Sequence, residues 1–202
     1  MGPTYSRKWS RMILALIVVA AGILVLFGPE EKTLGSGIKV VYIHVASIWA
    51  GMIGLFLAGV LGIGVLIFPN RNLQAWTHTV AGVALASFAV GVGLSIVAAK
   101  INWGAAFWNE PRMVASLRFL AVALLVQILN SWLPWYRLRG FLSVSLGTFL
   151  MWSILGPPLV LHPKSPIRES SSLAIQLTFL GMFILCCLVV AWFVWYVRRK
   201  SQ

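Results

Sequence analysis

Histidine is the residue in this sequence best suited to chemistry at neutral pH, because a neutral imidazole can donate a hydrogen bond, accept one or ligate a metal. The chain has three histidines: His44 in VYIHVASIWAG, His78 in QAWTHTV and His162 in PPLVLHPKSP. Each lies in or beside a long apolar run, where ionisable groups mark candidate functional sites. A single histidine in such a place can also serve only to hydrogen-bond a neighbouring helix.

Two of the histidines, His44 and His162, fall on the same side of the expected membrane spans. His44 is near the start of the second apolar run, and His162 follows the end of the fifth. Two neutral imidazoles, one early and one late in the chain, can ligate a haem iron from opposite faces. Zinc is disfavoured, because no further His, Cys or well-placed carboxylate completes a set of four ligands. His78 falls on the opposite side, and we interpret it as an interfacial residue beside Trp76.

The segment WGAAFWNEPR, residues 103–112, is a polar and aromatic interruption between apolar runs, in a loop expected over 100–112. Trp103, Phe107 and Trp108 are candidates for an aromatic shelf beneath a flat macrocycle such as a porphyrin. The same residues are also typical of an interfacial belt, where tryptophan is enriched whatever the function. The sequence leaves both interpretations open.

Two cations near this segment, Arg112 and Arg118, are candidates for binding the carboxylates of a ligand, such as haem propionates. Arginine suits this role because its guanidinium can bind a carboxylate with two hydrogen bonds. The alternative for Arg112 is a local ion pair with Glu110, one of only four acidic residues in the chain.

No arrangement typical of an enzyme active site appears in the sequence. There is no nucleophile beside a base, no pair of carboxylates and no phosphate-binding G-x-x-x-x-G-K-S/T motif. Cys186 and Cys187 are adjacent, and neighbouring cysteines rarely form a disulfide, so we interpret them as packing residues. We therefore expect no enzyme.

Two other functional classes are alternatives to a haem carrier. A cytochrome b-type membrane anchor subunit of a redox enzyme would usually need histidine pairs on two helices, often at both membrane faces. A small-solute transporter would need interrupted helices or charges at the middle of the membrane, and the apolar runs here have almost none.

The composition places these residues in a membrane. The chain has 202 residues, of which 60% are hydrophobic and 10% charged, and its mean hydropathy is +0.92; soluble domains have about 25% charged residues. We expect an all-α membrane protein, a single membrane domain over 1–202 that forms a bundle of six transmembrane helices. The expected spans are about 12–28, 41–68, 75–99, 113–133, 141–161 and 173–197.

The net charge of +12 arises from basic residues at the ends of the spans, which indicates membrane topology rather than nucleic-acid binding. Six spans place both termini on one side together with the loops near residues 70 and 137. That side has nine Lys and Arg, against seven on the other side, which holds all four acidic residues. The positive-inside rule then predicts that both termini are cytoplasmic and that segment 103–112 faces outward.

Small residues recur at a spacing of four within the expected spans, which is typical of helices that pack closely in lipid. The pairs are Ser47 and Gly51, Ala58 and Gly62, Ser87 and Gly91, and Ala89 and Gly93.

The residues resemble those of the CcmC/CcmF/CcsA family, the haem-handling membrane proteins of cytochrome c assembly, and most closely its six-span haem exporters. The segment YIHVASIW is similar to the family's H-V-P-S-x-W, with Ala46 in place of proline. The segment WGAAFWNEPR is similar to the family's W-G-x-x-W-x-W-D-x-R. Trp103, Gly104 and Arg112 match this motif, Glu110 stands where aspartate is expected, and Trp108 is out of phase by one position.

This resemblance implies a carrier of non-covalent haem b that acts with a set of partners. Haem is expected at the outer face of the inner (plasma) membrane, with His44 and His162 as ligands and Trp103, Phe107 and Arg112 beside it. The family passes haem to a periplasmic haem chaperone and acts with an ATP-binding transporter complex, and c-type cytochromes are the final destination. The expected surroundings are membrane lipid, without nucleic acid.

Overall fold

The computed structural model describes residues 3–155, 167 and 170–200. Its secondary-structure elements there are α-helices, which are joined by short turns and loops. Its only β-type pairing there is an isolated bridge between Glu31 and Gly35. The expectation of an all-α protein is confirmed for this part of the chain. Its helices are α1 (Pro3–Phe27), α2 (Ile38–Ile67), α3 (Arg71–Trp103), α4 (Pro111–Trp132), α5 (Tyr136–Leu155) and α6 (Leu173–Lys200).

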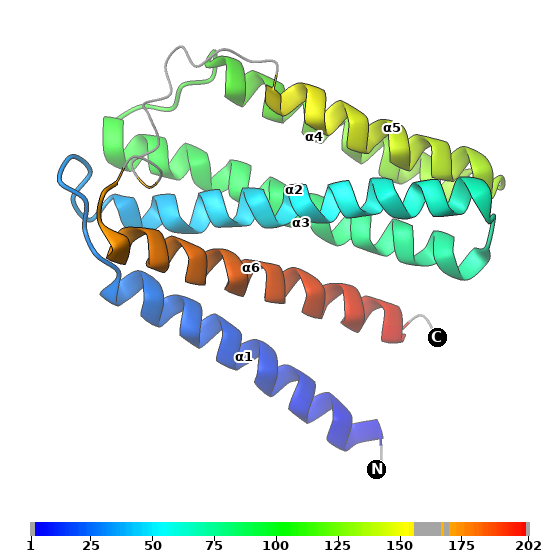
Figure 1. Cartoon of the computed structure of the whole chain (residues 1–202), viewed down its shortest axis with the longest axis horizontal. Coiled ribbons are helices and arrows are strands. Elements are labelled where there is room, and N and C mark those ends of the chain that lie inside the picture. The colour runs from blue at the N-terminus through cyan, green and yellow to red at the C-terminus, as the bar shows by residue number, and fades with distance from the viewer. Residues whose placement is uncertain (1–2, 156–166, 168–169, 201–202) are drawn as a thin grey trace.

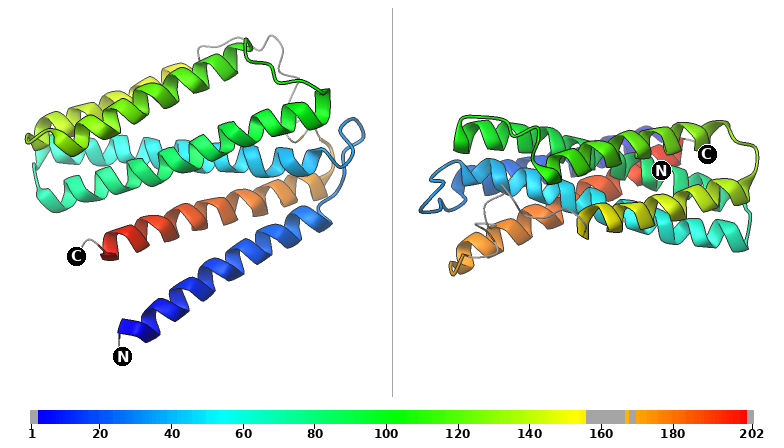
Figure 2. Two further views of the ribbon diagram at one scale, coloured as in Figure 1. Left: turned by 180° about the vertical axis from the view of Figure 1, so that it is seen from behind. Right: turned by 90° about the horizontal axis from the view of Figure 1, so that it is seen from above.

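The helices lie alongside one another and run back and forth along the long axis of the molecule (Figures 1 and 2). Both termini lie at one end, with the α2–α3 turn (68–70) and the α4–α5 turn (133–135); we call this the terminus end. The opposite end, which we call the loop end, has the α1–α2 loop (28–37) and the α3–α4 loop (104–110). The termini and loops are therefore grouped at the two ends as the count of Lys and Arg residues assumed.

Five of the described helices are long and apolar enough to cross a membrane, so the chain is a multi-pass membrane protein. The spans are Lys8–Phe27, Ile38–Ile67, Arg71–Trp103, Pro111–Trp132 and Leu173–Lys200. The described part of α5 does not qualify, and its first turn contains Arg137 and Arg139. The remainder of the expected fifth span, 156–161, lies outside the described residues.

Helices α1 to α5 each begin earlier than the spans predicted from the apolar runs. The Asn70 side chain accepts hydrogen bonds from the backbone N–H groups of Asn72 and Leu73, at 2.7 and 3.3 Å, and so starts α3 at Arg71 rather than near 75. Similarly, α5 starts at Tyr136, five residues before the apolar run. Hydropathy detects the membrane-spanning part of a helix but not its polar ends.

Close approach between helices depends on three of the predicted small-residue pairs. A Cβ atom at Gly51 would lie 2.6 Å from the Phe88 backbone nitrogen, and one at Gly62 would lie 2.9 Å from the Gly140 oxygen. Gly91 is equally confined, against Ile48. The prediction was wrong for the fourth pair, because Ala89 is exposed and Gly93 has no atom within 4 Å of its Cβ position.

Helix α2 lies at the centre and has a cluster of buried side chains on each of two faces. The first cluster joins α2 to α3, α4 and α5 and includes Leu55, Phe88 and Phe119, with the two phenylalanine rings 5.3 Å apart edge to face. The second joins α2 to α6 and the C-terminal part of α1 and includes Tyr42 and Met182. Helix α1 diverges from α6 toward the terminus end (Figure 1).

Candidate functional site

The two ends of the α3–α4 loop are fixed by local chemistry. Gly104 follows Trp103 with φ +75°, a conformation that favours glycine, and its N–H donates to the Lys100 carbonyl at 3.0 Å. At the other end Glu110 accepts a hydrogen bond from the Met113 N–H at 2.8 Å, and Pro111 is the first helical residue of α4. The sequence therefore forms a short, defined loop at this position.

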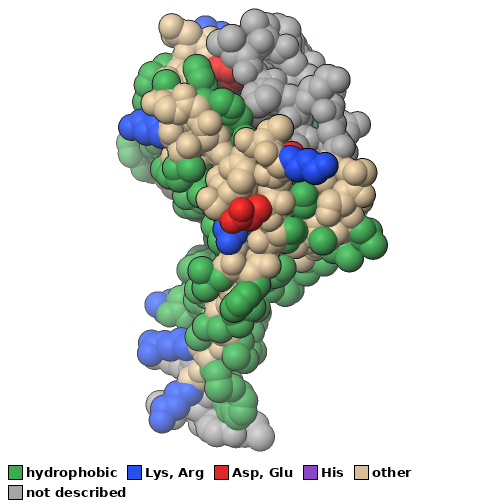
Figure 3. Space-filling model, turned by 90° about the vertical axis from the view of Figure 1, so that its left-hand side faces the viewer, with side chains coloured by type: hydrophobic (Ala, Val, Ile, Leu, Met, Phe, Trp, Pro, Cys, Tyr) green, Lys and Arg blue, Asp and Glu red, His purple; other side chains and the backbone are tan. Residues whose placement is uncertain are grey.

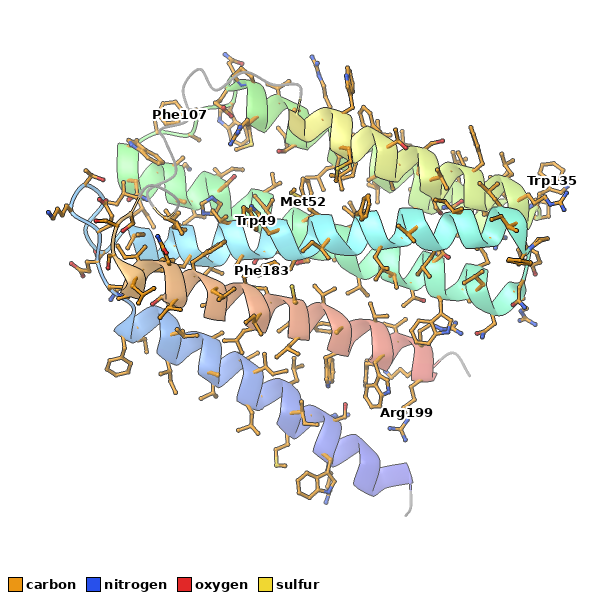
Figure 4. The ribbon with its side chains drawn as sticks, viewed as in Figure 1. Trp49, Met52, Phe107, Trp135, Phe183 and Arg199 are labelled. Atoms are coloured by element: carbon orange, nitrogen blue, oxygen red, sulfur yellow. The ribbon has the colours of Figure 1, made fainter. Side chains whose placement is uncertain are left out.

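The aromatic side chains of this segment are exposed at the loop end. The exposed fractions are 42% for Trp103, 38% for Phe107 and 54% for Trp108. Figure 4 shows Phe107 at the loop end, whereas Trp135 lies at the terminus end. Large aromatic surfaces exposed together are available to a ligand or to the lipid interface.

Arg112 and Arg118 are both exposed on α4. The alternative ion pair between Arg112 and Glu110 was wrong, since no contact within 4 Å joins these two described side chains. Glu110 is instead turned toward its own helix: it is only 6% exposed and uses one oxygen to cap α4. Its other oxygen has no hydrogen-bond partner in the described structure. Arg112 is exposed on the first turn of α4.

His44 is buried in α2, with 8% of its surface exposed. Its Nδ1 lies 3.3 Å from the Val40 carbonyl oxygen of the same helix. When Nδ1–H donates to this carbonyl, the neutral ring has its lone pair on Nε2, which is then the nitrogen able to coordinate a metal. Gly51 is seven residues further along and faces α3, so His44 lies on the same face of α2.

The loop end brings His44 and the aromatic segment to the same end but at different depths. The Asn102 side chain donates to the Gly37 carbonyl at 3.4 Å, which joins the end of α3 to the start of α2. His44 is six residues beyond Ile38, and therefore about 9 Å deeper along the helix axis. His162 lies outside the described residues.

The α1–α2 loop also lies at the loop end, which faces the viewer in Figure 3, and it is built around Glu31. The Glu31 carboxylate accepts hydrogen bonds from the Thr33 hydroxyl, the Thr33 N–H at 2.8 Å and the Leu34 N–H at 3.0 Å. These bonds, led by the one from the Thr33 hydroxyl, hold the pKa of Glu31 below its usual value. Tyr42 donates to the Pro29 carbonyl at 3.1 Å and ties the loop to α2. Sequence reasoning missed this element.

A polar cluster at the terminus end was also missed. Gln127 of α4 donates to the backbone carbonyl of His78 in α3 at 2.8 Å, and Asn130 donates to the Ser143 hydroxyl of α5 at 3.4 Å. Gln74 and Asn130 are each only 2% exposed. His78 is half-buried in α3, and its backbone carbonyl takes part in this cluster. Amide side chains within apolar runs were the signal that could have indicated it.

The described residues contain no group of three or more His, Cys, Asp or Glu side chains able to hold a metal ion. Cys186 and Cys187 are free thiols, both half-buried in α6, and the Cys186 sulfur lies 3.8 Å from the Ser47 hydroxyl.

A scan against protein-family models gave no match for the chain, and a search of the curated proteins found no similar sequence. The described chain is therefore characterised by its α-helices and by several apolar helices long enough to span a membrane.

Proposed function

We propose that this protein binds haem at its loop end and presents it for delivery to a haem chaperone in cytochrome c maturation. The observation that carries the proposal is the hydrogen bond between His44 Nδ1 and the Val40 carbonyl. It directs the coordinating lone pair to Nε2, in an apolar helix and at the same end as an exposed aromatic loop. The His44 imidazole would hold bound haem through its iron, which is the chemistry that the cofactor would supply.

The residues described at the loop end fit haem better than a bare metal ion. A bare ion needs several protein ligands, whereas haem needs only one or two axial ligands from the chain. Haem also has a flat apolar surface, to which the exposed rings of Trp103, Phe107 and Trp108 are suited. His162 is proposed as the second axial ligand on sequence grounds.

The arginines of α4 are proposed to bind the haem propionates. Arg112 is exposed because Glu110 caps the helix instead of pairing with it, and Arg118 is exposed on the same helix. A guanidinium can bind a carboxylate with two parallel hydrogen bonds, which fixes orientation as well as adding attraction.

The direction of delivery rests on the proposed topology. Nine Lys and Arg at the terminus end favour a cytoplasmic location for both termini, so the loop end faces outward from the inner membrane. A periplasmic haem chaperone and an ATP-binding transporter complex are the partners that the family resemblance implies. The chain itself is proposed to be a carrier, not an enzyme.

A haem titration of the purified protein, followed by the Soret absorption band, tests the assignment of His44. His44→Ala is expected to weaken haem binding at least tenfold, because it removes an axial ligand. The matched control is His78→Ala, which removes a histidine at the terminus end and is expected to leave binding unchanged. Equal weakening by both substitutions would contradict the proposed site.

A reversible redox titration coupled to quinone reduction separates this function from that of a cytochrome b-type anchor. A carrier is expected to bind haem without quinone-dependent electron transfer. Rapid quinone reduction by the haem-loaded protein would favour the redox subunit instead.

A further inference from the structure

A cleft of about 400 Å³ opens between α1 and α6 at the terminus end, where the two helices diverge (Figure 1). It is far from the loop end and plays no part in the proposed haem site. Its lining is aromatic and apolar with one cation: Trp9, Ser10, Ile13, Trp192, Trp195 and Arg199. Arg199 is at the terminus end in Figure 4.

The walls of the cleft are held in place by specific contacts. The Trp192 indole N–H donates to the Ser10 carbonyl at 3.0 Å and so joins α6 to α1 across the cleft. The Trp192 ring stacks on Tyr196 with 4.9 Å between the ring centroids. The Arg199 guanidinium lies 5.3 Å from the centroid of the Trp195 ring, a cation–π distance.

Ser10 adds an unsatisfied polar group to this cleft. It is 6% exposed, and its hydroxyl has no hydrogen-bond partner among the residues that the structure describes. A buried hydroxyl without a partner is costly, because it has lost its hydrogen bonds to water. A ligand that offers an acceptor oxygen here would remove that cost.

The charge around the cleft is positive. Lys8 and Arg11 on α1, and Arg198, Arg199 and Lys200 on α6, lie at the terminus end. The acidic side chains that the structure describes, Glu30, Glu31 and Glu110, are all in loops at the opposite end. The cleft therefore favours an anion, and its tryptophans are typical of the level of lipid headgroups.

We infer that this cleft binds an anionic phospholipid of the surrounding bilayer. One acyl chain lies against Trp9 and Ile13 between the diverging helices, and the phosphate interacts with Arg199 and accepts a hydrogen bond from the Ser10 hydroxyl. An apolar transmembrane helix of a partner would cover the apolar walls but would offer no anion to Arg199. A free phosphate would leave the apolar walls uncovered.

Native mass spectrometry of the full-length protein in detergent tests this inference with two lipids of identical acyl chains, phosphatidylglycerol and phosphatidylcholine. Phosphatidylglycerol is expected to bind about fivefold more tightly, the effect of one cation near an anionic headgroup. Arg199→Gln is expected to abolish this preference. Ser10→Ala, a minimal change, is expected to weaken binding of both lipids by roughly two- to tenfold through the lost hydrogen bond.

The matched control is Arg137→Gln, which removes one exposed cation at the same end of the molecule but on α5. It is expected to preserve the lipid preference. Ile13→Trp fills the cleft and is expected to weaken both lipids alike. Equal binding of the two lipids by the unaltered protein, equal losses in Arg137→Gln and Arg199→Gln, or full binding in Ile13→Trp would overturn the proposal.

Discussion

At the scale of single residues, hydrogen bonds decide which side chains are available for binding. Glu110 could have neutralised Arg112, but it caps its own helix and leaves the cation exposed. His44 Nδ1 lies 3.3 Å from the carbonyl oxygen of Val40, one turn earlier in the same helix. Each of these contacts lies within one helical turn, and each determines which group at the loop end can bind a ligand.

Glu31 gives a prediction for the pH dependence of stability. Hydrogen bonds to Thr33 and Leu34 lower the pKa of Glu31 in the folded state. These bonds therefore stabilise the fold at pH values above 4.5, the ordinary pKa of this side chain. This stabilisation is lost as pH falls through the lowered pKa, since the carboxylate is then protonated in both states. Thermal unfolding in detergent is expected to show a smaller acid-induced decrease for Glu31→Gln than for the unaltered protein. The neighbouring Glu30→Gln is the control, and an identical pH profile in all three proteins would contradict the role of Glu31.

Glu110 gives a second prediction at this scale. Glu110→Ala removes the cap of α4 and is expected to lower the free energy of unfolding by about 1 kcal/mol. Glu110→Asp keeps an acceptor at the cap position and is expected to retain most of that stability. Thermal or denaturant unfolding measures both, and equal destabilisation by the two changes would show that the cap is not the cause.

At the scale of helices, backbone contact at glycines determines how closely α2 approaches its neighbours. Gly51 and Gly93 provide a matched test, because both are helical glycines but only Gly51 lies against another backbone. Gly51→Ala is expected to cost about 1–3 kcal/mol through overpacking. Gly93→Ala is expected to be neutral or slightly stabilising, by up to about 1 kcal/mol. Thermal unfolding in detergent compares them, and equal effects would contradict the described α2–α3 contact.

The helices themselves could be predicted from the sequence because a long apolar run has few alternatives to a helix in lipid. Their polar ends could not be, since the start of α3 depends on the side chain of Asn70. The polar cluster around Gln127 and Asn130 requires three helices in register, and periodicity within one helix does not give that register. The position of Trp108 in a loop was predicted correctly, but the expected loop 100–112 was too long, since α3 continues to Trp103 and α4 begins at Pro111. The depth of His44 relative to the aromatic segment required the structure.

At the scale of the whole molecule, the chain has two chemically different ends. The terminus end has basic residues and the cleft between α1 and α6. The loop end has the described acids, the aromatic segment and His44. This asymmetry is the physical basis for the proposed topology, because basic residues are retained on the cytoplasmic side. It also separates the proposed haem site from the proposed lipid site.

Labelling of single cysteines tests this topology, in a background in which Cys186 and Cys187 are replaced by alanine. Ser36→Cys at the loop end is expected to react with a membrane-impermeant maleimide in cells whose outer membrane has been permeabilised and whose inner membrane is intact. Pro69→Cys at the terminus end is expected to react only after the membrane itself is permeabilised. The reverse pattern would place the loop end in the cytoplasm and contradict outward delivery.

The optical spectrum of the protein purified from haem-replete cells tests the central claim most directly. The unaltered protein is expected to have a b-type haem spectrum, His78→Ala is expected to keep it, and the double variant His44→Ala, His162→Ala is expected to lose most of the Soret absorption. Full haem occupancy in the double variant would contradict the assigned ligands, and absence of haem from the unaltered protein, even after haem is added, would contradict the proposed function.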